Sequence, residues 1–333
     1  MSYSSLNKLN SNAKVKDIVE IIDLLGYKCT GLLRSGEVGK IRDYFWFDEK
    51  DYHSWSGVEL SIYEVGGLIN IETRTPVGRS YFDLEQQNRT IRLLRKNFGG
   101  SFSTDEGKGQ YLNLRSGPPT PAASGCHLAF QRFGANLITS HVYFMNRNYK
   151  GPKHPASGIN YLDKMNPWLI SNNLLLPFLV SLFEDYWKST YIALLSYSKK
   201  KETILKSGRI SAERLASVSC GQFSIEHAFA ETMPFQRISA ICTHFTALDS
   251  KLNFCSILQK PYRRRKISLF KSLQEMTELR HQVIHRAEID SRVNDTFTKG
   301  LFHNIEVAVV KCYQHITKTY GWHYDKWWHT GKY

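Results

Sequence analysis

The 333-residue sequence contains no long hydrophobic run. Its most apolar stretch, Leu174 to Phe183, is far shorter than the roughly 20 residues needed to cross a bilayer, and it contains a proline. The first residues, MSYSSLNKLNSNAK, are polar and lack the apolar core of a signal peptide. We therefore expect neither membrane insertion nor secretion.

Cysteine is scarce: there are six, and none forms a C-x-x-C pair. Such spacing is typical of buried thiols in a reducing compartment, so we expect a cytoplasmic protein. The glycine-containing segments GEVGK and DEGKG lack the Gly-Lys-Ser/Thr ending of a phosphate-binding P-loop. The tail residues His323, Asp325 and His329 are poorly spaced for a metal site. We expect no metal and no cofactor.

Positive charge is abundant. Lys and Arg number 44 against 30 Asp and Glu, which gives a net charge of +14. A balance of this kind favours a polyanionic partner, nucleic acid first and an anionic membrane second. The alternative is a generally basic, soluble surface. The 42% apolar and 22% charged residues describe a globular protein, and the length indicates two domains.

Residues 1–160 are predicted to form a mixed α/β domain with a small antiparallel sheet. The alternating segments GVELSIYEV and LINIETRT are separated by Gly66-Gly67, which predicts a hairpin. Apolar spacing predicts two helices, and glycines follow each of them. The remaining strand candidates are short. The full set is helices at 14–25 and 82–98, a strand within 37–47, the hairpin at 57–75, and strands near 102 and 111–114.

The segment SGPPTPAASG, residues 116–125, has the composition of a linker, and a helix is expected from Cys126 to Asn146. Residues 161–333 are predicted to be all helical. The expected helices there cover 176–198, two short segments beginning near 211 and 225, 234–252 opened by Pro234, 268 to the end of the Arg-His stretch, and 297–320.

The most informative stretch is LRHQVIHR, residues 279–286. It ends an amphipathic helix that starts near Ser268 and is predicted to turn one apolar stripe inward: Leu269, Leu273, Met276, Val283 and Ile284. A guanidinium binds phosphate through a planar fork of donors, and an imidazole transfers protons near neutral pH. Arg280 and His285 held together could therefore cleave RNA, whose 2′-hydroxyl is a built-in nucleophile.

Other interpretations stay open at this point. Arg280 could be a surface arginine paired with Glu278 or Glu288, and His285 could simply interact with the helix dipole. A second Arg-His pair, Arg147 and His154, lies in a Gly/Pro segment without apolar periodicity. We interpret that second pair as fortuitous.

A helical bundle with an acidic residue in its first long helix and R-H-x-x-x-H near the end of its penultimate helix resembles the HEPN superfamily of ribonucleases. The motif of that family is R-x(4–6)-H, matched here by Arg280, His281 and His285. The segments LFEDYWKS around Glu184 and PFQRISAICTHF at 234–245 also look similar. The resemblance covers roughly residues 165–320, and no family is recognised for residues 1–160.

The resemblance implies a metal-independent endoribonuclease that dimerises so that two motifs face one cleft. His285 would transfer a proton, Arg280 would stabilise the transition state, His281 would assist, and Glu184 could hold Arg280 or His285. The expected products carry 2′,3′-cyclic phosphate and 5′-hydroxyl ends. The basic residues expected to follow the RNA backbone are Arg263, Arg264, Arg265, Lys266 and Arg286.

Three hypotheses of different class follow. The first is a ribonuclease effector of a toxin or antiphage system, with the N-terminal domain sensing a phage or host trigger or restraining the dimer. The second is a non-catalytic helical module that binds nucleic acid or a partner. The third is a small-molecule sensor whose activity resides in another protein of the same system. Substitution of Arg280 and His285 separates the first two hypotheses.

Overall fold

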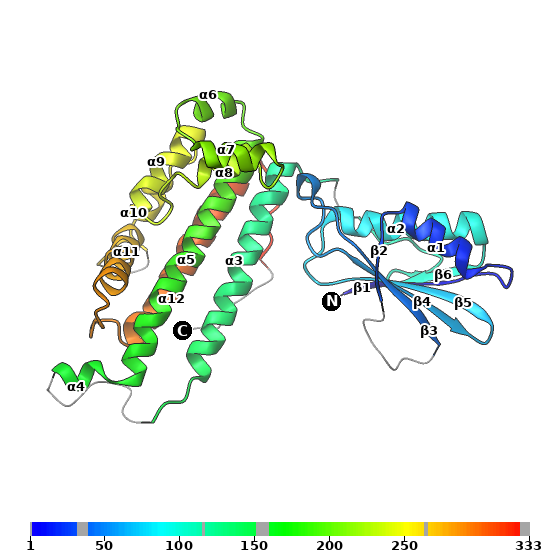
Figure 1. Ribbon diagram of the computed structural model, residues 1–333, viewed down its shortest axis with the longest axis horizontal. Helices are drawn as coiled ribbons and strands as arrows, with labels where there is room; N and C mark the ends of the chain where they lie inside the picture. Colours follow the sequence, from blue (N-terminus) through cyan, green and yellow to red (C-terminus); the bar gives the residue numbers. More distant parts are fainter. Residues whose placement is uncertain (1, 32–38, 115–116, 151–159, 263–265, 327–333) are drawn as a thin grey trace. The chain divides into compact units, whose positions relative to one another are not determined.

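The computed structural model describes residues 2–31, 39–114, 117–150, 160–262 and 266–326. The chain divides into two compact units, residues 1–124 and residues 125–333. The first unit contains a sheet with two helices, and the second is helical (Figure 1). The protein is therefore α+β, as its sequence predicts.

A seven-stranded antiparallel sheet forms the N-terminal unit, with strand order β2-β3-β4-β5-β1-β6-β7. The hairpin β4–β5 lies at its centre and joins at Gly66-Gly67, where both glycines have positive φ as a tight hairpin turn requires. The strands are β1 (Tyr3–Lys8), β2 (Lys28–Gly31), β3 (Lys40–Trp46), β4 (Val58–Val65), β5 (Leu68–Thr75), β6 (Ser101–Thr104) and β7 (Gly107–Lys108).

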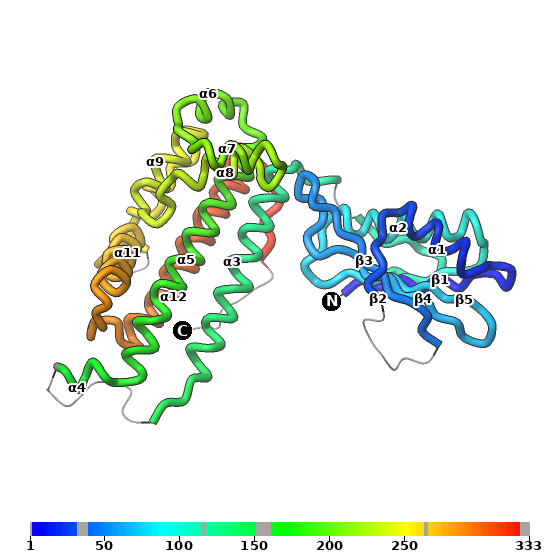
Figure 2. Tube along the Cα trace, in the orientation of Figure 1, coloured from blue at the N-terminus to red at the C-terminus, as the bar shows by residue number. Residues whose placement is uncertain are grey.

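Helix α2 (Tyr81–Phe98) packs on β1, β4 and β5, and α1 (Val15–Leu24) packs beside it (Figure 2). Ser80 and Asp83 form a capping box that begins α2, and Gly99 with φ 66° ends it. A short 3₁₀ turn, η1 (Lys50–Tyr52), precedes β4. The core joins one face of the sheet to α1 and α2, and its central members include Ile18, Ile22, Tyr44, Leu60, Ile62, Ile71 and Leu94.

The hairpin and both helices of this unit are confirmed, because alternation, glycine turns and apolar spacing are local signals. The strand expected at 111–114 is wrong: the chain is irregular there, and the strand after β6 is β7. Strand β1 was not predicted, although it pairs with both β5 and β6 inside the sheet. The sheet is therefore larger than expected.

The helical unit is built on long helices, with α5 packed against both α11 and α12 (Figure 1). Its helices are α3 (Pro121–Asn146), α4 (Asn160–Lys164), α5 (Pro167–Ser196), α6 (Lys201–Lys206), α7 (Ala212–Ser219), α8 (Ile225–Ala230), α9 (Ile238–Leu248), α10 (Phe254–Gln259), α11 (Leu269–Arg286) and α12 (Asp295–Tyr320). None of the described helices is long and apolar enough to span a membrane.

Helix α3 belongs to this second unit, so the boundary differs from the one expected at residue 160. Arg132 on α3 pairs with Asp185 on α5 at 3.0 Å, and the Phe130 ring stacks on Tyr313 of α12 with centroids 4.1 Å apart. The predicted linker 116–125 does include the boundary, but its last residues already form the start of α3.

Besides the start of α3, expected at Cys126 and found at Pro121, two predicted helix starts are wrong. Helix α5 begins at Pro167, capped by the Asn166 side chain, and runs through Pro177, where we had placed its first turn. Helix α9 begins at Ile238, after Arg237, and not at Pro234. Proline suits a first helical turn, but it does not by itself show where a helix begins.

The six cysteines are free thiols, and three of them, Cys126, Cys242 and Cys312, are buried as expected. Cys29 and Cys220 are exposed, which corrects the expectation that all are buried.

Candidate functional site

Helix α11 carries the Arg-His stretch. The hydroxyl of Ser268 caps it by accepting a hydrogen bond from the Lys271 N–H at 3.3 Å. Burial of one apolar stripe then fixes the helix against its neighbours. The buried residues are Leu269, Leu273, Met276 and Leu279.

The apolar stripe is not buried to the end of α11. Val283 is half-buried and Ile284 is exposed, which corrects the prediction that both face inward. The helix ends at Arg286, and Ala287 follows in the left-handed region with φ 52°, a conformation unusual for a residue with a Cβ. The last turns of α11 therefore present side chains to solvent.

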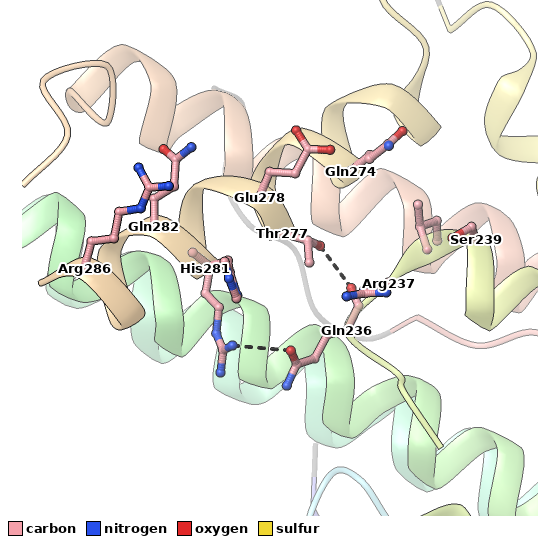
Figure 3. A pocket seen from close by; sticks show the side chains of 11 residues that line it. Gln236, Arg237, Ser239, Gln274, Thr277, Glu278, His281, Gln282 and Arg286 are labelled. Carbon is pink, nitrogen blue, oxygen red and sulfur yellow. Dashed lines mark hydrogen bonds between the residues drawn. The ribbon is translucent and has the colours of Figure 1, made fainter. Parts of the chain in front are cut away.

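A pocket of about 600 Å³ lies between α11 and the Gln236–Ser239 segment at the start of α9 (Figure 3). Its walls hold three arginines, Arg237, Arg280 and Arg286, and one carboxylate, Glu278, so their net charge is positive. The other lining residues are Gln236, Ile238, Ser239, Gln274, Thr277, His281 and Gln282.

Arg280 is held from the opposite wall. Its Nη1 donates a hydrogen bond to the Gln236 side-chain oxygen at 3.3 Å, and its buried Nε has no acceptor among the described residues. The Thr277 hydroxyl donates to the backbone carbonyl of Gln236 at 3.0 Å (Figure 3). Helix α11 therefore binds both the side chain and the backbone of Gln236. Because Gln236 is neutral, the guanidinium keeps its full charge for an anion.

The two histidines are neighbours on the exposed side of α11. The rings of His281 and His285, one helical turn apart, have centroids 4.2 Å from each other. His281 lines the pocket together with Arg280, whereas His285 does not. The arrangement places a cation and two imidazoles at one helix end, a set that can bind a phosphate diester and transfer protons to and from the oxygens bonded to its phosphorus.

Glu184, predicted to hold Arg280 or His285, is half-buried on α5 and makes no hydrogen bond or ion pair with any described residue. It does not line the pocket. Its neighbour Asp185 binds Arg132 instead. The positioning role that we assigned to Glu184 is filled in the structure by Gln236.

The predicted RNA-binding residues do not all lie at the pocket. Arg286 is exposed and lines the pocket. Lys266 is exposed just before α11 but does not line it. Arg263, Arg264 and Arg265 lie outside the described residues.

The loop that follows α11 is anchored to α5. The Asn173 side chain donates to the Asp290 carbonyl at 3.1 Å and accepts from the Asp290 N–H at 2.9 Å. Arg292 donates both to the Asp290 carboxylate and to the Gln282 side chain on α11. The Arg292 guanidinium lowers the pKa of Asp290. These contacts fix the end of α11, and with it the histidine pair.

Arg147, the arginine of the second Arg-His pair, has a structural role. It is buried, forms an ion pair with Asp295 at 2.5 Å and donates to the Asn172 side chain at 2.7 Å. The end of α3 is thereby joined to α5 and to the start of α12. His154 lies outside the described residues.

Gln236, Arg237 and Thr277 line the pocket but are not among the site residues expected from the sequence. Nothing in the spacing of the segment PFQRISAICTHF indicates that Gln236 contacts Arg280, 44 residues away. A glutamine with no obvious local partner carries little signal in one sequence.

Within the described parts of the chain, no group of three or more His, Cys, Asp or Glu side chains is arranged to hold a metal ion. No protein-family model, curated protein or solved structure matches this chain.

Proposed function

We propose that the protein is a metal-independent endoribonuclease whose catalytic side chains are those of Arg280, His281 and His285. One observation carries the proposal: Arg280 and His281 line the same positively charged pocket, and the His285 ring lies 4.2 Å from that of His281. A phosphate-binding cation beside two proton-transfer groups matches the needs of RNA transesterification.

In the proposed reaction, the substrate's 2′-oxygen attacks the adjacent phosphorus while an imidazole takes the hydroxyl proton. The bond from phosphorus to the 5′-oxygen breaks, and an imidazolium donates a proton to that oxygen. Arg280 stabilises the additional negative charge on the phosphorane-like transition state. The products are a 2′,3′-cyclic phosphate and a 5′-hydroxyl, and no oxidant, reductant or metal enters the balance.

The same geometry favours a homodimer as the active form. The attacking and leaving oxygens lie roughly in line on opposite sides of phosphorus. His281 and His285 are too close together to serve both sides, since their centroids are only 4.2 Å apart. A second copy of the chain would supply the other proton-transfer group.

The N-terminal unit is proposed to sense a trigger or restrain the dimer. A toxin or antiphage effector requires such control, because its RNA cleavage must stay inactive until the trigger appears. In support, every residue of the pocket comes from the helical unit, and the sheet unit has its own core. Such an arrangement allows regulation to be separate from cleavage.

The proposal is tested by comparing RNA cleavage by the purified protein with cleavage by Arg280→Ala, His281→Ala and His285→Ala. We expect each substitution to reduce the rate at least a hundredfold. Arg209→Ala is the matched control, because Arg209 is an exposed arginine that does not line the pocket. Equal cleavage by the parent and Arg280→Ala would leave only a binding module.

A further inference from the structure

The wall of the pocket opposite α11 is the beginning of α9. Arg237 is the residue that precedes its first turn, in an extended conformation, and no side chain caps this helix end. The first N–H groups of a helix have no partner within the helix and carry partial positive charge. Arg237 and Ser239, both exposed, bring this helix end to the pocket (Figure 3).

Arg237 is tied to Arg280 through a single residue. Gln236 accepts from Arg280 through its side chain and from Thr277 through its carbonyl, so the peptide leading to Arg237 is held against α11. The Arg237 guanidinium itself makes no hydrogen bond or ion pair with the described residues. The backbone next to Arg237 is thus held against α11, and its exposed side chain lines the same pocket as Arg280.

The pocket is larger than one phosphate needs. Its volume of about 600 Å³ lies in the range of sites that hold small organic ligands, such as a nucleotide. Three arginines and one glutamate line it, with Arg237 on the wall opposite α11, and the buried Nε of Arg280 has no acceptor among the described residues. These observations point to an anionic ligand that extends beyond Arg280.

We propose that the pocket binds a second phosphate of the RNA backbone, next to the phosphate at Arg280, through the Arg237 guanidinium and the N–H groups at the start of α9. The inference rests on the proposed function, because the ligand is taken to be RNA. The site then requires a strand with a second phosphate next to the one that is cleaved, so oligonucleotides are substrates and dinucleotides, which have one phosphodiester, are poor ones. Arg237 is a binding residue and not a participant in proton transfer.

The test measures binding to a fluorescein-labelled, 2′-O-methylated RNA of about twelve nucleotides, which cannot be cleaved because its 2′-oxygens are blocked. Anisotropy titrations of the full-length parent, Arg237→Ala, Arg237→Lys and Arg209→Ala are repeated over a range of KCl concentrations. We expect Arg237→Ala to bind about tenfold more weakly, with a salt slope smaller by about 0.7, the value for one lost phosphate contact on single strands. Arg237→Lys should keep most of the slope, and Arg209→Ala should match the parent.

Cleavage of unmodified RNA by the same proteins separates this inference from the proposed function. The inference predicts that Arg237→Ala raises KM and leaves kcat within about twofold of the parent. Unchanged affinity and salt slope in Arg237→Ala would overturn the second phosphate site, even if cleavage still depends on Arg280. Loss of binding in Arg237→Ala from a parent that cleaves nothing would keep the site and remove the nuclease. A parent that neither binds nor cleaves RNA would overturn both.

Discussion

At the scale of single residues, the contact between Arg280 and Gln236 decides how much charge the pocket offers. A neutral amide orients the guanidinium through one hydrogen bond of 3.3 Å and leaves its charge uncompensated. A carboxylate at the same place would form an ion pair and compete with a phosphate for the same donors. The identity of the partner therefore matters as much as its position.

Gln236→Glu tests this reasoning. We expect kcat/KM for RNA cleavage to fall about tenfold or more above pH 6, where the new carboxylate is ionised. Gln236→Ala should have a smaller effect, because it removes an orienting contact without neutralising Arg280. Cleavage by Gln236→Glu equal to or faster than that of the parent would contradict the role assigned to the neutral amide.

A buried histidine outside the pocket provides a prediction about pH. Burial lowers the pKa of His127 to about 3, with a smaller contribution from His323. The Gln131 amide donates to its Nε2 at 3.1 Å, and its Nδ1 lies 3.2 Å from the Tyr313 hydroxyl, which suits the neutral ring. Since an unfolded histidine titrates near 6.5, the unfolded chain binds the extra proton between pH 6.5 and 3.

The free energy of unfolding should therefore be highest above pH 6.5 and fall as the pH drops towards 3, with His127 contributing up to about 1.4 kcal/mol per pH unit. Urea denaturation of the parent and His127→Gln at several pH values between 7 and 4 measures the difference. The variant should be less stable at pH 7 and show a shallower pH dependence. Parallel curves for the two proteins would show that His127 does not remain neutral in the fold.

The placement of the candidate residues on one helix was easier to predict than their contacts. The short stretch LRHQVIHR brings Arg280, His281 and His285 to one helix end, because residues three to five apart share a helix face. The neighbours of those residues depend on packing between distant segments. Glu184 is expected from the sequence to hold Arg280 or His285, whereas in the structure Gln236 binds Arg280.

At the scale of helices and strands, a buried polar network connects α3, α5 and α12. Arg147 and Asp295 have side chains only 2% and 14% exposed, and both bind Asn172. Asn173, the next residue of α5, holds the loop after α11. The network thus joins the end of α3 to the segment that fixes the candidate site.

Arg147→Ala is expected to lower the free energy of unfolding by about 3–5 kcal/mol, because it leaves Asp295 partly buried without its cation. Arg132→Ala is the matched control: its ion pair with Asp185 is about half exposed on both sides and should be worth at most about 1 kcal/mol. Chemical denaturation of both variants measures the two values. Similar losses in the two proteins would mean that the buried network does not stabilise the bundle.

Elements with local signals were predicted well, and elements defined by distant pairing were not. The capping box at Ser80 begins α2, and glycines follow its last residue, Phe98. Both ends of this helix are therefore marked by residues close to them in the sequence. Strand β1 depends on pairing with β5, more than 60 residues later, and its sequence YSSLNK alternates only weakly. A short polar strand inside a sheet is recognised only when its partners are known.

At the scale of the whole molecule, the composition of the linker predicts where the chain divides into two units. It does not predict to which unit α3 belongs. The apolar pattern of a helix shows that one face is buried and says nothing about which unit buries it. The contacts of Arg132 and Phe130 assign α3 to the helical unit. The residues that line the candidate pocket, in contrast, all lie within the helical unit.

Dimerisation is expected to be visible in solution. Leu174 and Phe178, one turn apart on α5, are 67% and 50% exposed, and the residue before Leu174 binds the loop after α11. We propose that these two side chains contribute to the contact between the two copies. Sedimentation equilibrium should show a dimer of the parent.

Leu174→Glu combined with Phe178→Glu should shift the protein to a monomer and reduce RNA cleavage at least tenfold, with unchanged circular dichroism. Leu24→Glu is the control, because Leu24 is an apolar residue that is even more exposed, at 83%, on α1 of the other unit. A parent that is monomeric at concentrations where it cleaves RNA fully would contradict the shared site.

The most direct test of the account identifies the ends of the RNA fragments that the purified protein produces in excess chelator. We predict 2′,3′-cyclic phosphate and 5′-hydroxyl ends from the parent, and at least a hundredfold less product from Arg280→Ala. Cleavage abolished by the chelator, or the same fragments made as fast by Arg280→Ala, would contradict an arginine–histidine mechanism at the end of α11.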